Sequence, residues 1–144
     1  SPELSGDLDT NGYALVSQSN ASIAITPDGT GRTKVAALEA ALPLNAQTGT
    51  SYTLVLSDAE KLVTMDNASP ITLTVPENAS VALDTGSKIN IVQTGAGQVT
   101  IEGDGAVTIN APETLKLRGQ YSAATLIKTA ADSWLLLGDL EESA

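Results

Sequence analysis

The strict alternation of apolar and polar residues is the feature that most constrains this chain. Alternate residues of a strand point to opposite faces of a sheet, so a period of two predicts strands with one buried face. We expect at least ten short strands, and the clearest are Ser22–Thr26, Ile71–Val75, Lys88–Ile91, Val99–Glu102, Val107–Asn110, Leu115–Arg118 and Thr125–Lys128.

Turn residues separate these segments at spacings of about 8 to 12 residues, as in β-sandwiches, rolls and barrels. Asn-Gly, Asp-Gly and Gly-rich clusters provide most of the turns. Only two stretches have helical character. Lys34–Ala41 ends close to Pro43 and allows a turn or two, and Ser57–Lys61 predicts a single turn.

The sequence predicts an all-β chain in two parts. Residues 1–44 form a short, repetitive, stalk-like β element, and residues 45–144 form a compact antiparallel β-sandwich or barrel. The first part has few large apolar side chains, so it needs a surface supplied by the second part or by identical chains. We expect the chains to be intertwined as a homotrimer. Because the sequence begins with Ser1 and not with Met, we expect a longer parent chain.

Composition excludes several classes of function. The chain has 144 residues and a net charge of −10, and its seven Lys and Arg residues are scattered, so we expect no nucleic-acid binding. No apolar run approaches the roughly 20 residues that span a bilayer, so we expect no membrane insertion. His and Cys are absent. We therefore expect no cofactor and no enzymatic activity.

Carboxylate pairs are the remaining option for catalysis, as in glycan-cleaving enzymes. The acids Asp84, Glu102 and Asp104 lie in or next to predicted turns. Exposure to solvent explains them there, which disfavours a catalytic pair.

The sharpest local motif is Asp7-Leu8-Asp9-Thr10-Asn11-Gly12, the first half of a calcium loop. Gln18 stands where such a loop supplies a bidentate Glu, and no predicted helices flank it. Two interpretations remain open. Asp7, Asp9 and Asn11 either form a weak divalent-cation site or make a turn in which their side chains bind backbone donors.

Aromatic residues are few: Tyr13, Tyr52, Tyr121 and Trp134. Tyr52 and Tyr121 are the candidates for exposed contact with a ligand, since aromatic faces stack on sugar rings. The run Trp134, Leu135, Leu136 and Leu137 breaks the alternation and predicts burial on both faces. Either a subunit interface or a central strand of a monomeric sandwich explains it. The sequons at Asn20, Asn67 and Asn78 are interpreted as turns.

Two stretches resemble structural proteins of phage virions. The run Gly6–Gly12, followed by Ser19–Gly31, is similar to a repeated segment of phage tail fibres, especially those of marine phages. Tyr52–Leu56, Asp58–Val63, Ile71–Pro76, Gly86, Val107–Asn110 and Ser133–Gly138 resemble a small domain that closes many tail and fibre proteins. Glu60 departs from that pattern, which has Gly before the Lys, and this leaves the local turn geometry open.

The resemblance implies a trimeric, non-enzymatic module at the surface of a phage particle. It would contact other virion proteins and a host surface glycan or protein. The alternative is a capsid or appendage decoration protein that works only in assembly, without a host ligand. A third hypothesis, a glycan-degrading spike, requires the carboxylate pair disfavoured above.

Overall fold

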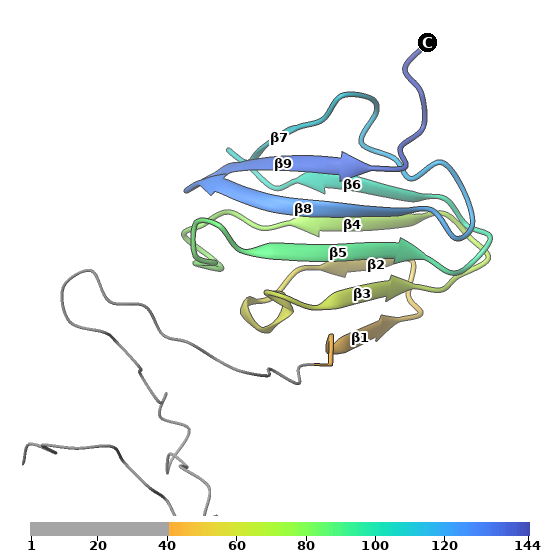
Figure 1. Cartoon of the computed structure of the whole chain (residues 1–144), viewed down its shortest axis with the longest axis horizontal. Helices are drawn as coiled ribbons and strands as arrows, with labels where there is room; N and C mark the ends of the chain where they lie inside the picture. The colour runs from red at the N-terminus through yellow and green to blue at the C-terminus, as the bar shows by residue number, and fades with distance from the viewer. Residues whose placement is uncertain (1–40) are drawn as a thin grey trace, which may run out of the picture. The chain divides into compact units, whose positions relative to one another are not determined.

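The computed structural model describes residues 41–144, and these are all-β apart from one short 3-10 turn. The predicted all-β class is confirmed. Figure 1 shows the elements in chain order: β1 (Leu44–Gln47), β2 (Ser51–Thr53), η1 (Leu56–Asp58), β3 (Leu62–Met65), β4 (Ile71–Val75), β5 (Lys88–Gln93), β6 (Val99–Gly103), β7 (Thr108–Asn110), β8 (Ala123–Ala130) and β9 (Ser133–Gly138).

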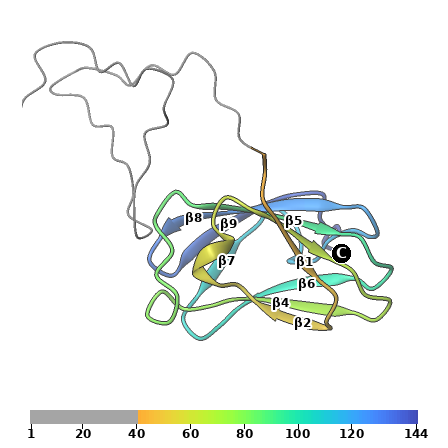
Figure 2. The ribbon, with the colours of Figure 1, turned by 90° about the horizontal axis from the view of Figure 1, so that it is seen from below.

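The strands form two sheets that lie face to face (Figure 2). The larger sheet has the order β1-β3-β5-β8-β9-β7, and the smaller has the order β2-β4-β6. Strands β1 to β6 alternate between the two sheets along the chain. Each consecutive pair therefore makes one rung of a β-solenoid: β1 and β2 form rung 1, β3 and β4 rung 2, and β5 and β6 rung 3.

Strand direction differs from the antiparallel pairing expected from the sequence. Neighbouring strands in the three rungs run parallel in both sheets, with Leu44 opposite Leu62 and Leu62 opposite Asn90. The cause is the winding path, because the chain returns to each sheet only after crossing the other and so enters it in the same direction. Antiparallel pairing occurs where β8 lies between β5 and β9.

Repetitive β structure is present in the part predicted to be a compact domain. The structure places the rungs within residues 44–103, inside the part expected to be a plain sandwich or barrel. Leu44, the last residue of the predicted stalk-like element, begins β1. The rest of that element, up to residue 40, falls outside the described residues, as does the predicted strand Ser22–Thr26.

The core lies between the two sheets and is built from aliphatic side chains around one tryptophan. The predicted strand Ile71–Val75 matches β4, whose first, third and fifth residues are buried. The buried apolar residues are Leu54, Val63, Met65, Ile71, Leu73, Val75, Leu83, Ile89, Ile91, Val99, Ile101, Leu117, Ala124, Leu126, Trp134, Leu136 and Leu140.

Turns of successive rungs stack on one another with little space between them. The Asn67 side chain donates to the Thr48 carbonyl in the rung below (2.6 Å) and accepts the Ser69 N–H (2.8 Å). The Gly97 N–H donates to the Asn67 carbonyl (2.8 Å). A Cβ atom at Gly97 would lie 1.9 Å from the Ser69 carbonyl oxygen. Glycine is therefore required there, and the interpretation of Asn67 as a turn residue is confirmed.

The single turn predicted for Ser57–Lys61 is the 3-10 turn η1 and the residues after it. Glu60 stands where the phage domain that the sequence resembles has glycine, and its φ is 61°. This left-handed conformation costs a residue with a Cβ atom about 1–2 kcal/mol. Lys88 holds it in place, since Glu60 N–H donates to the Lys88 carbonyl (2.7 Å) and Glu60 Oε1 accepts the Lys88 N–H (3.0 Å). Glu60 therefore has the backbone conformation that a glycine would adopt at this position.

Candidate binding surface

Tyr121 is the most exposed large hydrophobic residue of the described part of the chain, at 74%. It lies in the loop that leads into β8 (Ala123–Ala130), next to the end of β5. Its φ of 68° is the left-handed conformation that only glycine adopts without cost. A tyrosine kept in this conformation with its ring in solvent is a candidate contact residue, because strained backbone often marks functional sites.

Hydrogen bonds on both sides hold the Tyr121 backbone. Its N–H donates to the Gln93 carbonyl at the end of β5 (2.6 Å), and Gln93 N–H donates to the Ser122 carbonyl (3.0 Å). The Gln120 side chain donates to the Thr94 carbonyl (2.9 Å). The buried Gln93 side chain in turn accepts the Val99 N–H (3.0 Å). The loop is therefore fixed to rung 3 and presents the ring on a rigid support.

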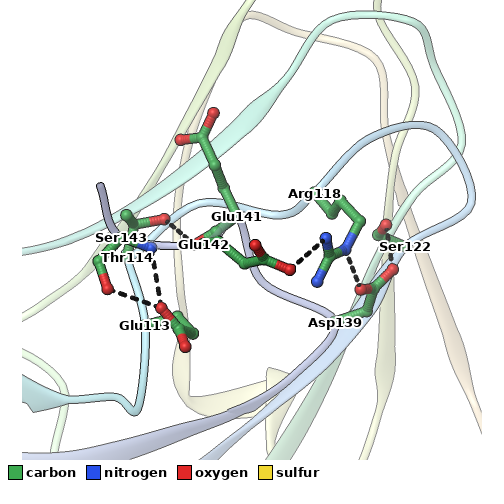
Figure 3. Close-up of polar contacts among 8 residues, drawn as sticks. All are labelled: Glu113, Thr114, Arg118, Ser122, Asp139, Glu141, Glu142 and Ser143. Carbon is green, nitrogen blue, oxygen red and sulfur yellow. Dashed lines mark hydrogen bonds and ion pairs between the residues drawn. The ribbon is translucent and has the colours of Figure 1, made fainter.

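A charged network adjoins this loop (Figure 3). Asp139 accepts hydrogen bonds from the Ser122 hydroxyl and from Arg118 Nε, both at 2.6 Å. Arg118 also pairs with Glu142 (3.3 Å). The Ser122 hydroxyl and then Arg118 lower the pKa of Asp139, and Asp139 raises the pKa of Arg118. Because the Arg118 guanidinium is already engaged, it is a poor ligand for an additional anion.

A second group ties the C-terminal segment to the residues before Arg118 (Figure 3). Glu113 Oε2 accepts the Ser143 N–H (2.8 Å) and hydroxyl (2.7 Å), and the Ser143 N–H is the main cause of the lowered pKa of Glu113. The Thr114 hydroxyl donates to the Glu141 carbonyl (2.8 Å). These exposed and half-buried groups bind one another and fasten the chain end, whereas the Tyr121 ring lies in solvent.

Tyr52, the other predicted contact residue, is engaged inside the molecule. Its hydroxyl donates to Asp58 Oδ2 (2.8 Å) and accepts from Asn45 Nδ2 (2.8 Å). Asp58 is fully buried and also accepts Asn45 Nδ2 (2.7 Å) and the Val55 N–H (2.9 Å). Burial and then the Asp58 hydrogen bond raise the pKa of Tyr52. The two tyrosines are therefore not one site, and only Tyr121 has the exposure that contact requires.

The four residues Trp134 to Leu137 alternate in β9 between core and surface. Trp134 and Leu136 are buried in the chain's own core, Leu135 is half-buried, and Leu137 is 46% exposed. Strand β9 lies between β8 and β7. This central position explains the apolar run, as the alternative to a subunit interface anticipated. Leu137 is the member of the run whose side chain is available to another chain.

The predicted cation ligands Asp7, Asp9 and Asn11 lie outside the described residues. Within residues 41–144, no group of three or more acidic, His or Cys side chains could hold a metal ion. No helix of this part is long and apolar enough to cross a membrane.

Lys128 is a buried charged residue that the sequence analysis did not single out. It follows Leu126 by two positions in an alternating strand, so both side chains point to the core. That spacing alone could have identified it.

Comparisons with protein-family models, curated protein sequences and solved structures found no match to this chain. Functional arguments therefore depend on the residues themselves.

Proposed function

We propose that this chain is a non-enzymatic structural and adhesive module of a phage tail fibre, located at the surface of the virion. In this proposal, three copies assemble around one axis and present their Tyr121 rings to the host surface. The observation that carries the proposal is an exposed tyrosine ring held in a left-handed backbone conformation by the end of β5. The sequence resemblance to tail-fibre segments supports the virion context.

The scaffold suits presentation of a contact residue. The Tyr121 loop is fixed to a two-sheet core, so little conformational freedom is lost when a ligand binds. Three equivalent rings on one particle raise avidity without high affinity at each site. A weak stacking contact would then be sufficient for attachment.

Charge restricts the ligand class. The net charge of −10 repels polyanions, and the nearby Arg118 is paired with Asp139 and Glu142. A neutral sugar ring stacked on Tyr121 is not repelled by the negative charge and does not require an unpaired Arg118. We therefore propose a neutral surface glycan as the ligand.

Binding of the purified protein to a panel of immobilised neutral bacterial polysaccharides tests this proposal. Tyr121→Asn removes the ring and keeps a residue that tolerates the left-handed conformation. We expect Tyr121→Asn to abolish binding and Tyr121→Phe to retain it. Equal binding by the Asn variant, or no binding by the unmodified protein to any polysaccharide, would contradict the proposal.

A second candidate is an assembly or decoration module with no host ligand. Leu42, Leu44 and Leu56 are exposed by 50% or more near rung 1. Within the described residues, β1 and β2 are the end strands of their sheets. Such edges readily accept a further strand. Loss of virion assembly in Leu44→Lys, with polysaccharide binding absent from the unmodified protein, would favour this candidate.

A further inference from the structure

Lys128 lies at a core-facing position of β8 and is 2% exposed. Trp134, its partner across β8 and β9, covers it with the ring centroid 5.7 Å from Nζ. Among the ion pairs of residues 41–144, none includes Lys128. Nζ instead donates to the Leu83 carbonyl (2.8 Å) and to Asn78 Oδ1 (2.5 Å). Burial of an ammonium group that is bound only to neutral acceptors costs free energy, and this cost makes the arrangement unusual.

The amine of Lys128 and the amide carbon of Asn78 are close neighbours. Since a carbonyl bond is about 1.23 Å long, the 2.5 Å contact places Nζ no more than about 3.7 Å from Asn78 Cγ. Reacting atoms in near-attack arrangements are about 3–3.5 Å apart. The Leu83 carbonyl fixes the direction of the amine, and the Trp134 ring limits access of competing water.

We propose that Lys128 and Asn78 become joined by an intramolecular isopeptide bond. The uncharged Nζ attacks Cγ of Asn78, and a C–N bond forms while the carbonyl oxygen takes up the electron pair. The carbonyl then re-forms, the bond from Cγ to Nδ2 breaks, and a proton from Nζ passes to Nδ2. Ammonia leaves, and no oxidant or reductant is needed. Asn78 is only half-buried, which gives the ammonia a route to solvent.

Asp132 is the carboxylate placed to assist. Its Oδ1 accepts the backbone N–H of Asn78 (2.7 Å), so it is anchored on the residue that reacts. It is a positioning residue in this proposal, because it holds the backbone of Asn78 in place beside Lys128.

The bond would connect the two sheets covalently. Asn78 lies in the segment after β4 of the smaller sheet, whereas Lys128 belongs to β8 of the larger sheet, 50 residues further along the chain. A cross-link here would close a long loop and resist separation of the sheets. It would replace a costly buried charge with an amide whose remaining N–H can still donate to Leu83.

Mass spectrometry of the denatured full chain tests the proposal. We expect a mass lower than that of the sequence by one ammonia after prolonged incubation of the folded protein. Trypsin should then fail to cleave after Lys128 and should release a branched peptide that contains both residues. A chain incubated in denaturant should keep its full mass, because the bond requires the folded geometry.

Two results would overturn the proposal. One is a full mass after prolonged incubation. The other is a loss of ammonia with normal cleavage after Lys128, which would indicate a cyclic imide at Asn78 instead of a cross-link.

Variants separate the roles of the three residues. Asn78→Ala and Lys128→Met should keep the full mass, and Asn78→Ala, at a half-buried position, serves if Lys128→Met does not fold. Asn67→Ala is the matched control and should still lose ammonia, since Asn67 binds only turn backbone. Asp132→Ala removes the acceptor of the Asn78 N–H, and we expect it to slow bond formation, whereas Asp132→Asn retains an acceptor and should restore the rate. An unchanged rate in Asp132→Ala would contradict the positioning role of Asp132.

Discussion

The three rungs and the C-terminal strands bury charge in different ways. In rung 1, the buried carboxylate of Asp58 accepts hydrogen bonds from Asn45, Tyr52 and Val55. In β8, the buried amine of Lys128 has only two neutral acceptors. The exposed Tyr121 and the Arg118 network also belong to the C-terminal part. A buried carboxylate with several donors therefore accompanies the rungs, whereas the buried lysine and the exposed tyrosine lie in the strands and loops that follow them.

The largest expected effect comes from truncation of the core of the C-terminal part. Trp134→Ala should lower the free energy of unfolding by about 4 kcal/mol, because it removes the one aromatic side chain of the described core. Denaturant titration measures this. Leu137→Ala, on the exposed face of the same strand, is the control and should change stability by less than about 0.5 kcal/mol. Similar losses in both variants would contradict the assignment of faces in β9.

The next largest loss of stability is expected when a methyl group is placed between rungs 2 and 3. Gly97→Ala places Cβ 1.9 Å from the Ser69 carbonyl, and we expect a loss of about 3 kcal/mol as the turns separate. Gly119→Ala, where nothing lies within 4 Å, is the matched control and should be nearly neutral. Thermal unfolding of both variants provides the measurement. If Gly97→Ala were tolerated as well as the control, the close stacking of rungs 2 and 3 would be wrong.

Asp58→Asn should lower the free energy of unfolding by about 2 kcal/mol, because the new amide group cannot accept from all of the donors that surround Asp58. The exposed turn residue Asp84 provides the control, Asp84→Asn. The same variant should bring the phenol of Tyr52 to ionise at lower pH, since Asp58 helps to raise its pKa. Ultraviolet titration of the phenolate follows this change. An unchanged titration would show that Asp58 does not contact Tyr52.

Acid should produce a smaller effect, centred on the C-terminal part. The pKa values of Glu113, Asp139 and Glu141 are lowered in the folded chain, as is that of Glu60. The contribution of these carboxylates to the free energy of unfolding is therefore complete when the pH lies above their ordinary pKa values, 4.5 for Glu and 3.8 for Asp. It is lost as the pH falls through their pKa values in the folded chain. We expect the midpoint of thermal unfolding to decrease below about pH 4. A constant or rising midpoint in this range would contradict the assigned pairs.

Sequence alternation predicted which residues face the core but not which strands pair. Ile71–Val75 and Lys88–Ile91 were located correctly, because the period of two depends on local backbone geometry alone. The same alternation fits a parallel rung and an antiparallel hairpin. The direction of pairing depends on how the chain crosses between the two sheets, and no single turn motif in the sequence determines that crossing.

The candidate site was predictable in part. Tyr52 and Tyr121 were both predicted as exposed contact residues, and Tyr121 is exposed. The hydroxyl of Tyr52 instead binds the buried Asp58, 6 residues away, which local patterns do not reveal. The Lys128–Asn78 pair is separated by 50 residues. Its proximity depends on tertiary packing, although the position of Lys128 two residues after Leu126 already indicated a lysine facing the core.

Light scattering of the purified chain on a sizing column tests the central claim of a multivalent module most directly. We predict a mass of three chains that does not change on dilution. A stable mass of one chain would contradict the trimer and with it the avidity on which the proposed attachment depends.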